Sequence, residues 1–226
     1  MDGNGSGEHL LGGEEGPCEQ WNGHTILNLE PQDKVITASA NAWKKRYQIK
    51  DNKCFSMGRD LPGYTITSKG CLAPPVCERF TKLMIFAHGN EDQVHDYDAG
   101  GLATYLCQEL GFKKAGLIAV RSCEAGKGDL LDDLSAALGE QKAEVGWLIG
   151  YRLSASTMGR FLFFGEAREI VSDIDPPRCK LEIYDMFWHM IGTKSSDAYR
   201  VKIVPGNASF DMGGKKAKRY SNKKKV

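Results

Sequence analysis

The sequence predicts an α/β protein, a three-layer α/β/α sandwich with a mostly parallel central sheet. Three short apolar runs, at residues 82–87, 115–120 and 145–151, are typical of strands that are covered on both faces. Two amphipathic helical patterns separate these runs. Because a strand–helix–strand–helix–strand order requires right-handed crossovers, we expect the three strands to lie parallel in one sheet with helices on its faces.

The chain before this central unit predicts shorter elements. We expect strands at residues 24–29 and 34–37, where apolar side chains alternate or cluster, and a helix at 38–50. The Gly, Pro and Asn content of residues 51–75 indicates loops, with one short strand at 64–67.

The two helices of the central unit carry start and stop signals. Asp98 is a suitable N-cap for the first helix, and Gly111 stands where a left-handed C-terminal residue is expected. Asp129 opens the second helix, and Gly139 follows its apolar stripe. Each helix has leucines that would face the sheet: Leu102, Leu106 and Leu110 in the first, and Leu130 or Leu131, Leu134 and Leu138 in the second.

The pattern weakens after residue 155. Residues 161–171 favour a helix, 181–190 a helix or a strand, and 199–204 a strand. We expect the last dozen residues to be disordered.

Length and composition favour one domain between two polar ends. The 226 residues, 41% of them hydrophobic and 26% charged, have room for one sizeable core. Residues 1–20 are rich in Gly and Glu, so we expect a flexible acidic leader before a domain at 21–212. Residues 213–226 form a basic tail.

The net charge of +1 conceals oppositely charged ends. Residues 1–30 carry six acids and no Lys or Arg, whereas residues 213–226 carry seven Lys or Arg and no acid. Subtracting those seven charges leaves −6 for residues 1–212, which argues against a generally basic nucleic-acid-binding body. The basic tail is the part that would contact polyanions or an acidic surface.

The cysteines and the first residues indicate a reducing compartment. Seven cysteines occur without a CxxC pair, which argues against a disulfide scaffold and against a four-cysteine zinc site. No apolar run approaches the roughly 20 residues of a membrane span, and the first residues lack the pattern of a secretory signal. The cytoplasm is therefore the expected location, with export as an effector or nuclear import through the basic tail left open.

The loops after the predicted strands hold the candidate catalytic residues. In parallel α/β sheets, chemistry collects beyond the carboxyl ends of the strands. His88 and Gly89 follow the first central strand, and Ser122 and Cys123 follow the second. Adjacent strands are about 4.8 Å apart, so the imidazole of His88 can reach and activate the thiol of Cys123. The backbone amides of Gly89 and Cys123 are candidates for an oxyanion hole.

An apolar strand ending in His88-Gly89, then one helix and a second apolar strand ending in Ser122-Cys123, resembles the caspase-fold cysteine peptidases of clan CD. The resemblance covers about residues 81–126. It implies a caspase-like sandwich, a catalytic dyad of His88 and Cys123, and endopeptidase activity without a cofactor on a protein or peptide substrate, either its own chain or another. Arg121 departs from the pattern, since caspases have Gln there, and we assign no subfamily.

The resemblance also implies that the segment after the third strand helps to wall the primary specificity pocket. Arg152 and Ser154 lie in that segment. A guanidinium suits a carboxylate, so Arg152 would pair with an acidic substrate side chain. The residue preferred before the cleaved bond, the oligomeric state and any activating ligand are left open.

Two other kinds of site are alternatives. His88, Glu91 and His95 form a local His-x2-Glu-x3-His arrangement, but its spacing differs from the HExxH of a helical zinc site, so we predict no metal and expect the acids of this loop to be solvated or to orient His88. Residues 125–128, Ala-Gly-Lys-Gly, resemble a phosphate loop without the other Walker residues. The alternative function is a catalytically silent or phosphate-ligand-binding α/β interaction module, and a third hypothesis makes the basic tail the functional part.

Overall fold

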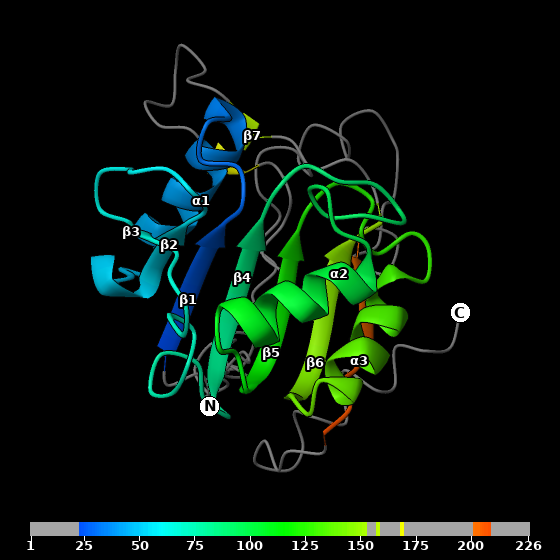
Figure 1. Ribbon diagram of the computed structural model, residues 1–226. Coiled ribbons are helices and arrows are strands. Elements are labelled where there is room, and N and C mark those ends of the chain that lie inside the picture. The colour runs from blue at the N-terminus through cyan, green and yellow to red at the C-terminus, as the bar shows by residue number, and fades with distance from the viewer. Residues whose placement is uncertain (1–22, 153–156, 159–167, 170–200, 209–226) are drawn as a thin grey trace, which may run out of the picture.

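The computed structural model describes residues 23–152, 157–158, 168–169 and 201–208. Within these residues a seven-stranded sheet runs in the order β3-β2-β1-β4-β5-β6-β9 (Figure 1). Neighbouring strands are parallel except β9, which pairs antiparallel with β6. The strands are β1 (Gly23–Asn28), β2 (Cys54–Ser56), β3 (Thr65–Ile66), β4 (Thr81–Phe86), β5 (Lys114–Arg121), β6 (Glu144–Tyr151) and β9 (Val201–Pro205).

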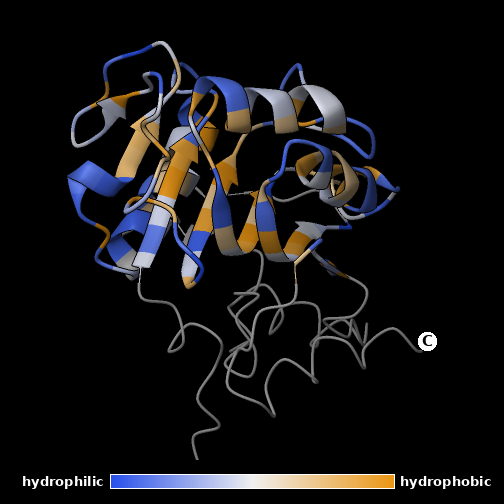
Figure 2. Cartoon of the chain, turned by 60° about the horizontal axis from the view of Figure 1, so that its bottom comes forward, coloured by the Kyte–Doolittle hydropathy of each residue, from blue (hydrophilic) through white to orange (hydrophobic). Residues whose placement is uncertain are grey.

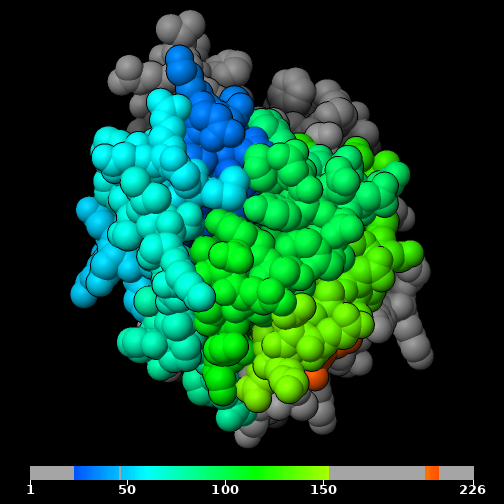
Figure 3. Space-filling model, in the orientation of Figure 1, coloured from blue at the N-terminus to red at the C-terminus, as the bar shows by residue number. Residues whose placement is uncertain are grey.

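Helices cover both faces of this sheet. α1 (Lys34–Arg46) packs on one face. α2 (Ala99–Thr104), its π-helical continuation η3 (Tyr105–Glu109) and α3 (Leu130–Glu140) pack on the other face, in front of the sheet in Figure 1. In the space-filling view of Figure 3, the side chains of these segments cover much of the same face. The predicted three-layer α/β/α arrangement with a mostly parallel sheet is confirmed.

The two faces of the sheet form two separate cores. Successive residues of a strand point to opposite faces, so Met84 packs in the cluster under α1, whereas Leu83 and Ile85 pack in the cluster under α2 and α3. All six residues of β4 are buried. Figure 2 shows hydrophobic residues concentrated along the central strands and hydrophilic residues on the outer helices and loops.

The central unit follows the sequence prediction closely. β4, β5 and β6 coincide with the three apolar runs to within one residue at each end. Asp98 caps α2, because its Oδ1 accepts a hydrogen bond from Gly101 N at 2.7 Å, and Gly111 has a φ of 71°. Gly139 lies inside α3, and Lys142 has the positive φ after the helix. The four predicted leucines of α3 are buried: Leu130, Leu131, Leu134 and Leu138.

The predicted strand at 34–37 is wrong. Asp33 Oδ1 accepts hydrogen bonds from Val35 N at 2.7 Å and Ile36 N at 2.9 Å, so α1 begins at Lys34. This local cap outweighs the β-branched side chains of the first turn, which favour a strand. The strands β1 and β3 agree with the prediction, whereas the three-residue β2 was not predicted.

The chain after β6 confirms one prediction and corrects another. β9 lies within one residue or two of the strand expected at 199–204. β8 (Arg168–Glu169) pairs antiparallel with β7 (Thr157–Met158), so the predicted helix at 161–171 is wrong at those two residues. No helix of the described part is long and apolar enough to cross a membrane. Three predictions concern segments outside the described residues: the leader at 1–20, the element at 181–190 and the tail at 213–226.

Candidate functional site

Three neighbouring strands end level with one another at the carboxyl edge of the sheet. β1 and β4 pair as far as Asn28 and Phe86, and β4 and β5 pair as far as Phe86 and Arg121. Since adjacent strands are about 4.8 Å apart, the segments beyond these pairs leave the sheet side by side. Each strand is followed, two positions beyond its last paired residue, by a polar residue: Glu30 after β1, His88 after β4 and Cys123 after β5.

Gly89 and Ser122 bring the two predicted motifs into direct contact. A Cβ atom at Gly89 would overlap Ser122 Oγ and the carbonyl oxygen of Gln93. A side chain at position 89 would therefore force the loop after β4 away from the loop after β5. Glycine is required here by the close approach of these two segments, which carry His88 and Cys123.

Two carboxylates face one side of the His88 ring. His88 Nε2 lies 3.3 Å from Asp33 Oδ2 and 3.9 Å from Glu30 Oε2, and the imidazole is about half exposed. A carboxylate beside Nε2 favours the tautomer with the proton on that nitrogen. Among the described residues, no hydrogen bond engages the opposite nitrogen, Nδ1.

Asp33 has two tasks at this edge. Its Oδ1 caps α1, while its Oδ2 faces His88. The hydrogen bond from the Ile36 amide, and then those from His88 and the Val35 amide, hold the pKa of Asp33 below its ordinary value against the opposing effect of burial. The carboxylate is therefore ionised at neutral pH, where it is needed to hold an imidazole.

Glu30 is a buried carboxylate on the same side of His88. Its side chain is 10% exposed. Its Oε1 accepts a hydrogen bond from the backbone amide of His88 at 3.0 Å and lies 3.2 Å from Nδ1 of His95. Sequence reasoning missed both Glu30 and Asp33; it expected the acids of the His88 loop either to be solvated or to orient His88. The available signal was their position directly after the first predicted strand.

The Cys123 loop is tied to the neighbouring strand. Cys123 is half-buried, and Glu124 after it has a positive φ of 56°. Gly126 N donates a hydrogen bond to Tyr151 O at 2.6 Å, and a Cβ at Gly126 would overlap the carbonyl oxygen of Gly150. The turn after β5 therefore rests directly on the end of β6.

The two amides proposed for an oxyanion hole lie at the ends of β4 and β5. Gly89 forms an isolated antiparallel bridge in the hairpin that follows β4. The hydrogen bonds of this bridge start from the amides of Asn90, at 3.0 Å, and His95, at 2.8 Å, so the bridge does not use the amide of Gly89. The amide of Cys123 begins the turn after β5.

The residues predicted to contact substrate lie partly within the described chain. Arg152 is exposed directly after β6. Val120 pairs with Gly150, so Arg152 comes level with Ser122 at the edge that carries Cys123. Ser154 lies outside the described residues.

Arg121, which departs from the caspase pattern, is buried on the α1 face of the sheet. Its guanidinium lies 3.9 Å from the centre of the Trp43 ring, and it donates a hydrogen bond to the hydroxyl of Tyr151. Stacking on an aromatic face stabilises a buried guanidinium. Arg121 therefore joins α1 to the ends of β5 and β6, on the opposite face from α2 and α3.

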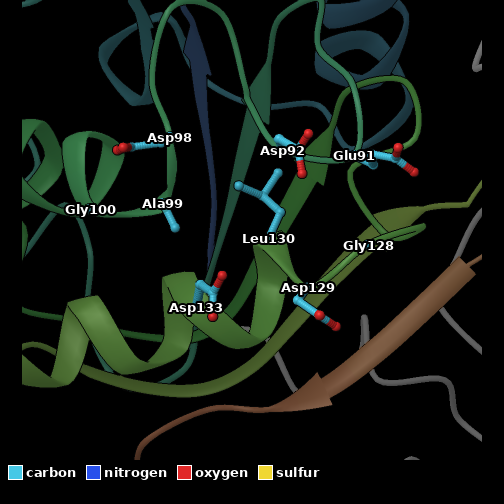
Figure 4. A pocket seen from close by; sticks show the side chains of 9 residues that line it. All are labelled: Glu91, Asp92, Asp98, Ala99, Gly100, Gly128, Asp129, Leu130 and Asp133. Atoms are coloured by element: carbon cyan, nitrogen blue, oxygen red, sulfur yellow. The ribbon is translucent and has the colours of Figure 1, made fainter.

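An acidic cavity of about 560 Å³ lies between the loop after β4 and the first turns of α2 and α3, and neither His88 nor Cys123 lines it (Figure 4). Its lining comes from the loop after β4 and the first turns of α2 and α3: Glu91, Asp92, Asp98, Ala99, Gly100, Gly128, Asp129, Leu130 and Asp133. The carboxylates among these residues give the cavity a negative charge, which would repel an anionic ligand.

The candidate phosphate loop is surrounded by acids. Lys127 Nζ lies 3.1 Å from Glu91 Oε2 and 3.3 Å from Glu124 Oε2, and these hydrogen bonds raise the pKa of Lys127. Lys202 donates a hydrogen bond to Gly128 O at 2.6 Å. The cation that a phosphate would need is already neutralised, so the geometry does not favour phosphate binding. Among the described residues, no group of three or more His, Cys, Asp or Glu side chains is arranged to hold a metal ion.

Comparison with known proteins gives a distant structural likeness. The sequence matches no family model and no curated protein. Part of the fold is similar to the X-ray structure of a secreted C11 cysteine protease from Bacteroides thetaiotaomicron in complex with an irreversible peptide inhibitor, at 8% sequence identity and a TM-score of 0.37. The likeness covers 59% of this chain and 49% of that protein, so it spans about half the length of that protease.

Proposed function

We propose that the chain is a cysteine endopeptidase that cleaves a protein or peptide through Cys123 and His88. The observation that carries the proposal is the register of β4 and β5, from which the His88-Gly89 and Ser122-Cys123 segments emerge as neighbours. Two contacts support it. Gly89 packs against Ser122, and carboxylates face Nε2 of His88, which leaves Nδ1 as the nitrogen for proton transfer.

The proposed reaction is acyl transfer through a thioester. The Cys123 thiolate attacks the peptide carbonyl carbon, and the amides of Gly89 and Cys123 hold the negative oxygen that forms. The C–N bond then breaks, and the His88 imidazolium gives its proton to the leaving amine. Water next attacks the thioester and gives a proton to His88. The new acid is released as Cys123 recovers its thiolate.

Asp33 would orient His88 during this cycle. The imidazole alternates between neutral and charged forms as it gives and takes a proton, and a fixed carboxylate at Nε2 keeps the ring in one orientation through both forms. The lowered pKa of Asp33 keeps this carboxylate ionised.

Arg152 is the proposed contact for the substrate residue that precedes the cleaved bond. It is exposed after β6, and its guanidinium suits an acidic side chain. We assign Ser154 to the same region on the basis of the sequence alone. The basic tail at 213–226 is proposed to contact polyanions or an acidic surface.

The proposal is tested by the rate at which iodoacetamide modifies Cys123 at pH 7, followed by mass spectrometry of the intact chain. We expect His88→Ala to lower this rate about tenfold, because imidazolium no longer stabilises the thiolate. The second measurement is the appearance of new N-termini in a peptide library. Cys123→Ala should abolish cleavage, whereas the matched variant Cys71→Ala should retain it.

The competing function is a catalytically silent interaction module on the same scaffold. It predicts that His88→Ala leaves the modification of Cys123 unchanged and that no peptide in the library is cleaved. Those two results together would replace the endopeptidase proposal.

A further inference from the structure

The hairpin after β4 returns to His88 through a second histidine. His95 has a φ of 55°, a left-handed conformation that is uncommon for a residue with a side chain. Its backbone amide donates a hydrogen bond to the carbonyl oxygen of His88 at 2.8 Å. The turn between them is therefore closed at its base, directly beside the candidate dyad.

Glu30 completes a ring of hydrogen bonds around the backbone of His88. Its Oε1 accepts from the amide of His88 at 3.0 Å and lies 3.2 Å from Nδ1 of His95. The carbonyl oxygen of His88 accepts from the amide of His95 at 2.8 Å. Both backbone groups of His88 are thus held by the pair formed by Glu30 and His95, and the three residues come from two different loops.

The environment of this ring is largely closed. The His95 side chain is 19% exposed, and its ring lies edge-on to Tyr97 with centroids 6.0 Å apart. Asp96 is exposed, and its Oδ2 lies 3.5 Å from Nε2 of His95. The inner nitrogen of His95 therefore faces the buried Glu30, and the outer nitrogen faces a solvated acid.

We propose that His95 is a positioning residue, which fixes the backbone of His88 by holding Glu30 through its Nδ1–H group. The inference rests on the proposed peptidase function, because the position of His88 matters only if His88 acts on Cys123. Without the Nδ1–H donor, Glu30 loses one of its two partners and the closed ring around His88 opens. A shift of the His88 ring by about 1 Å is enough to lower the rate of a catalysed step about a hundredfold.

Two substitutions at position 95 separate this task from a general structural one. Asparagine places an amide N–H close to where Nδ1–H lies and tolerates a positive φ, so His95→Asn keeps the donor. Glycine accepts the same backbone conformation without strain but has no donor. Both variants should fold, and their melting temperatures are measured to verify it.

The readout is the rate of Cys123 modification by iodoacetamide at pH 7. We expect His95→Gly to lower this rate about fivefold or more, up to the roughly tenfold loss of His88→Ala, and His95→Asn to stay within about twofold of the wild type. Asp96→Asn is the matched control, because it changes the group at the outer nitrogen only, and we expect no change. Equal rates for His95→Gly and the wild type, or no rescue by asparagine, would overturn the proposal.

A double-mutant cycle tests whether His95 acts through Glu30. Methionine is close to glutamate in length but has no oxygen acceptor, so Glu30→Met removes the link without removing the bulk. We expect the double variant Glu30→Met/His95→Gly to be no slower than Glu30→Met alone. Additive losses would contradict the proposed route.

The reference variant distinguishes the two proposals. If His88→Ala lowers the modification rate and His95→Gly does not, only the positioning task is refuted. If His88→Ala itself has no effect, the peptidase function and the positioning task are refuted together.

Discussion

At the scale of single residues, three thiols of the described part differ from Cys123 in their burial. Burial raises the pKa of Cys54 and Cys107 to about 11 and that of Cys77 to about 12. These cysteines lie in the two cores and behave as small apolar residues. Cys123 instead lies half-buried in the loop that follows β5.

This difference predicts the pattern of alkylation in the folded protein. The thiolate is the reactive form, so at pH 8 we expect iodoacetamide to leave Cys54, Cys77 and Cys107 unmodified. Peptide mapping by mass spectrometry measures the extent at each site. In concentrated urea all of them should react, which serves as the control. Modification of Cys77 in the folded protein at the rate found in urea would contradict its burial.

Asp33 makes a second residue-scale prediction, about stability. Loss of the helix cap in Asp33→Ala should lower the free energy of unfolding by about 1 kcal/mol at pH 7. Because folding lowers the pKa of Asp33, the ionised carboxylate stabilises the fold above about pH 4 and loses this effect as the pH falls through the folded value. The difference between wild type and Asp33→Ala should therefore shrink in acid, as urea unfolding at several pH values would measure.

Asp33→Asn is the matched variant. Asparagine caps a helix about as well as aspartate does, so Asp33→Asn should lower the free energy of unfolding at pH 7 by less than Asp33→Ala does. A stability difference between wild type and Asp33→Ala that stays constant down to pH 2 would show that ionisation of Asp33 has no part in it.

At the scale of the elements, α3 depends on its leucine stripe. Leu134 is fully buried in the core under α2 and α3. We expect Leu134→Ala to lower the free energy of unfolding by about 2–5 kcal/mol, because it leaves a cavity that the sheet cannot fill. Glu140→Ala, at the exposed end of the same helix, should change it by less than about 0.5 kcal/mol. Similar effects of both variants in chemical denaturation would argue against this packing.

At the same scale, the contact between the loops after β4 and β5 predicts the effect of a substitution at Gly89. Gly89→Ala introduces a Cβ that overlaps Gln93 O and Ser122 Oγ, so we expect it to cost about 1–3 kcal/mol and to slow the modification of Cys123. Gly100→Ala is the control. Its Cβ would meet Asp98 Oδ1 only at an ordinary 3.7 Å, and alanine favours the helix. The loop packing would be refuted if both variants behaved alike in unfolding and alkylation.

At the scale of the whole molecule, β9 is the edge strand of the sheet next to β6. Val204 of β9 is buried in the core under α2 and α3. After the strand, Asn207 Oδ1 accepts a hydrogen bond from Val145 N at 2.9 Å, and its Nδ2 donates to Ala143 O at 2.7 Å. One side chain thus binds the end of β9 to the start of β6.

We expect Asn207→Ala to lower the free energy of unfolding by about 1–3 kcal/mol, since both hydrogen bonds are lost and one of them serves a buried strand. Thermal or urea unfolding gives the measurement. Asn52→Ala, at an exposed position before β2, is the reference and should change little. An unchanged stability for Asn207→Ala would mean that the side chain does not hold this edge.

The sequence by itself determined the central unit and the places of His88 and Cys123 at the ends of its strands. The reason is that these features are local. Continuous apolar runs identify β4, β5 and β6, a capping aspartate begins α2, and a leucine stripe identifies α3. The same local reasoning was wrong at 34–37, where β-branched residues favour a strand but Asp33 caps a helix.

Only the tertiary structure decided which side chains surround His88. Local patterns do not give the order of strands, and β1 becomes the neighbour of β4 through packing between segments about 58 residues apart in the chain. That pairing brings Glu30 and Asp33 to His88, and it packs Gly89 against Ser122 only because β5 lies on the other side of β4. Contacts between distant segments depend on how side chains from many parts of the chain pack in the two cores. A short stretch of sequence therefore does not predict them.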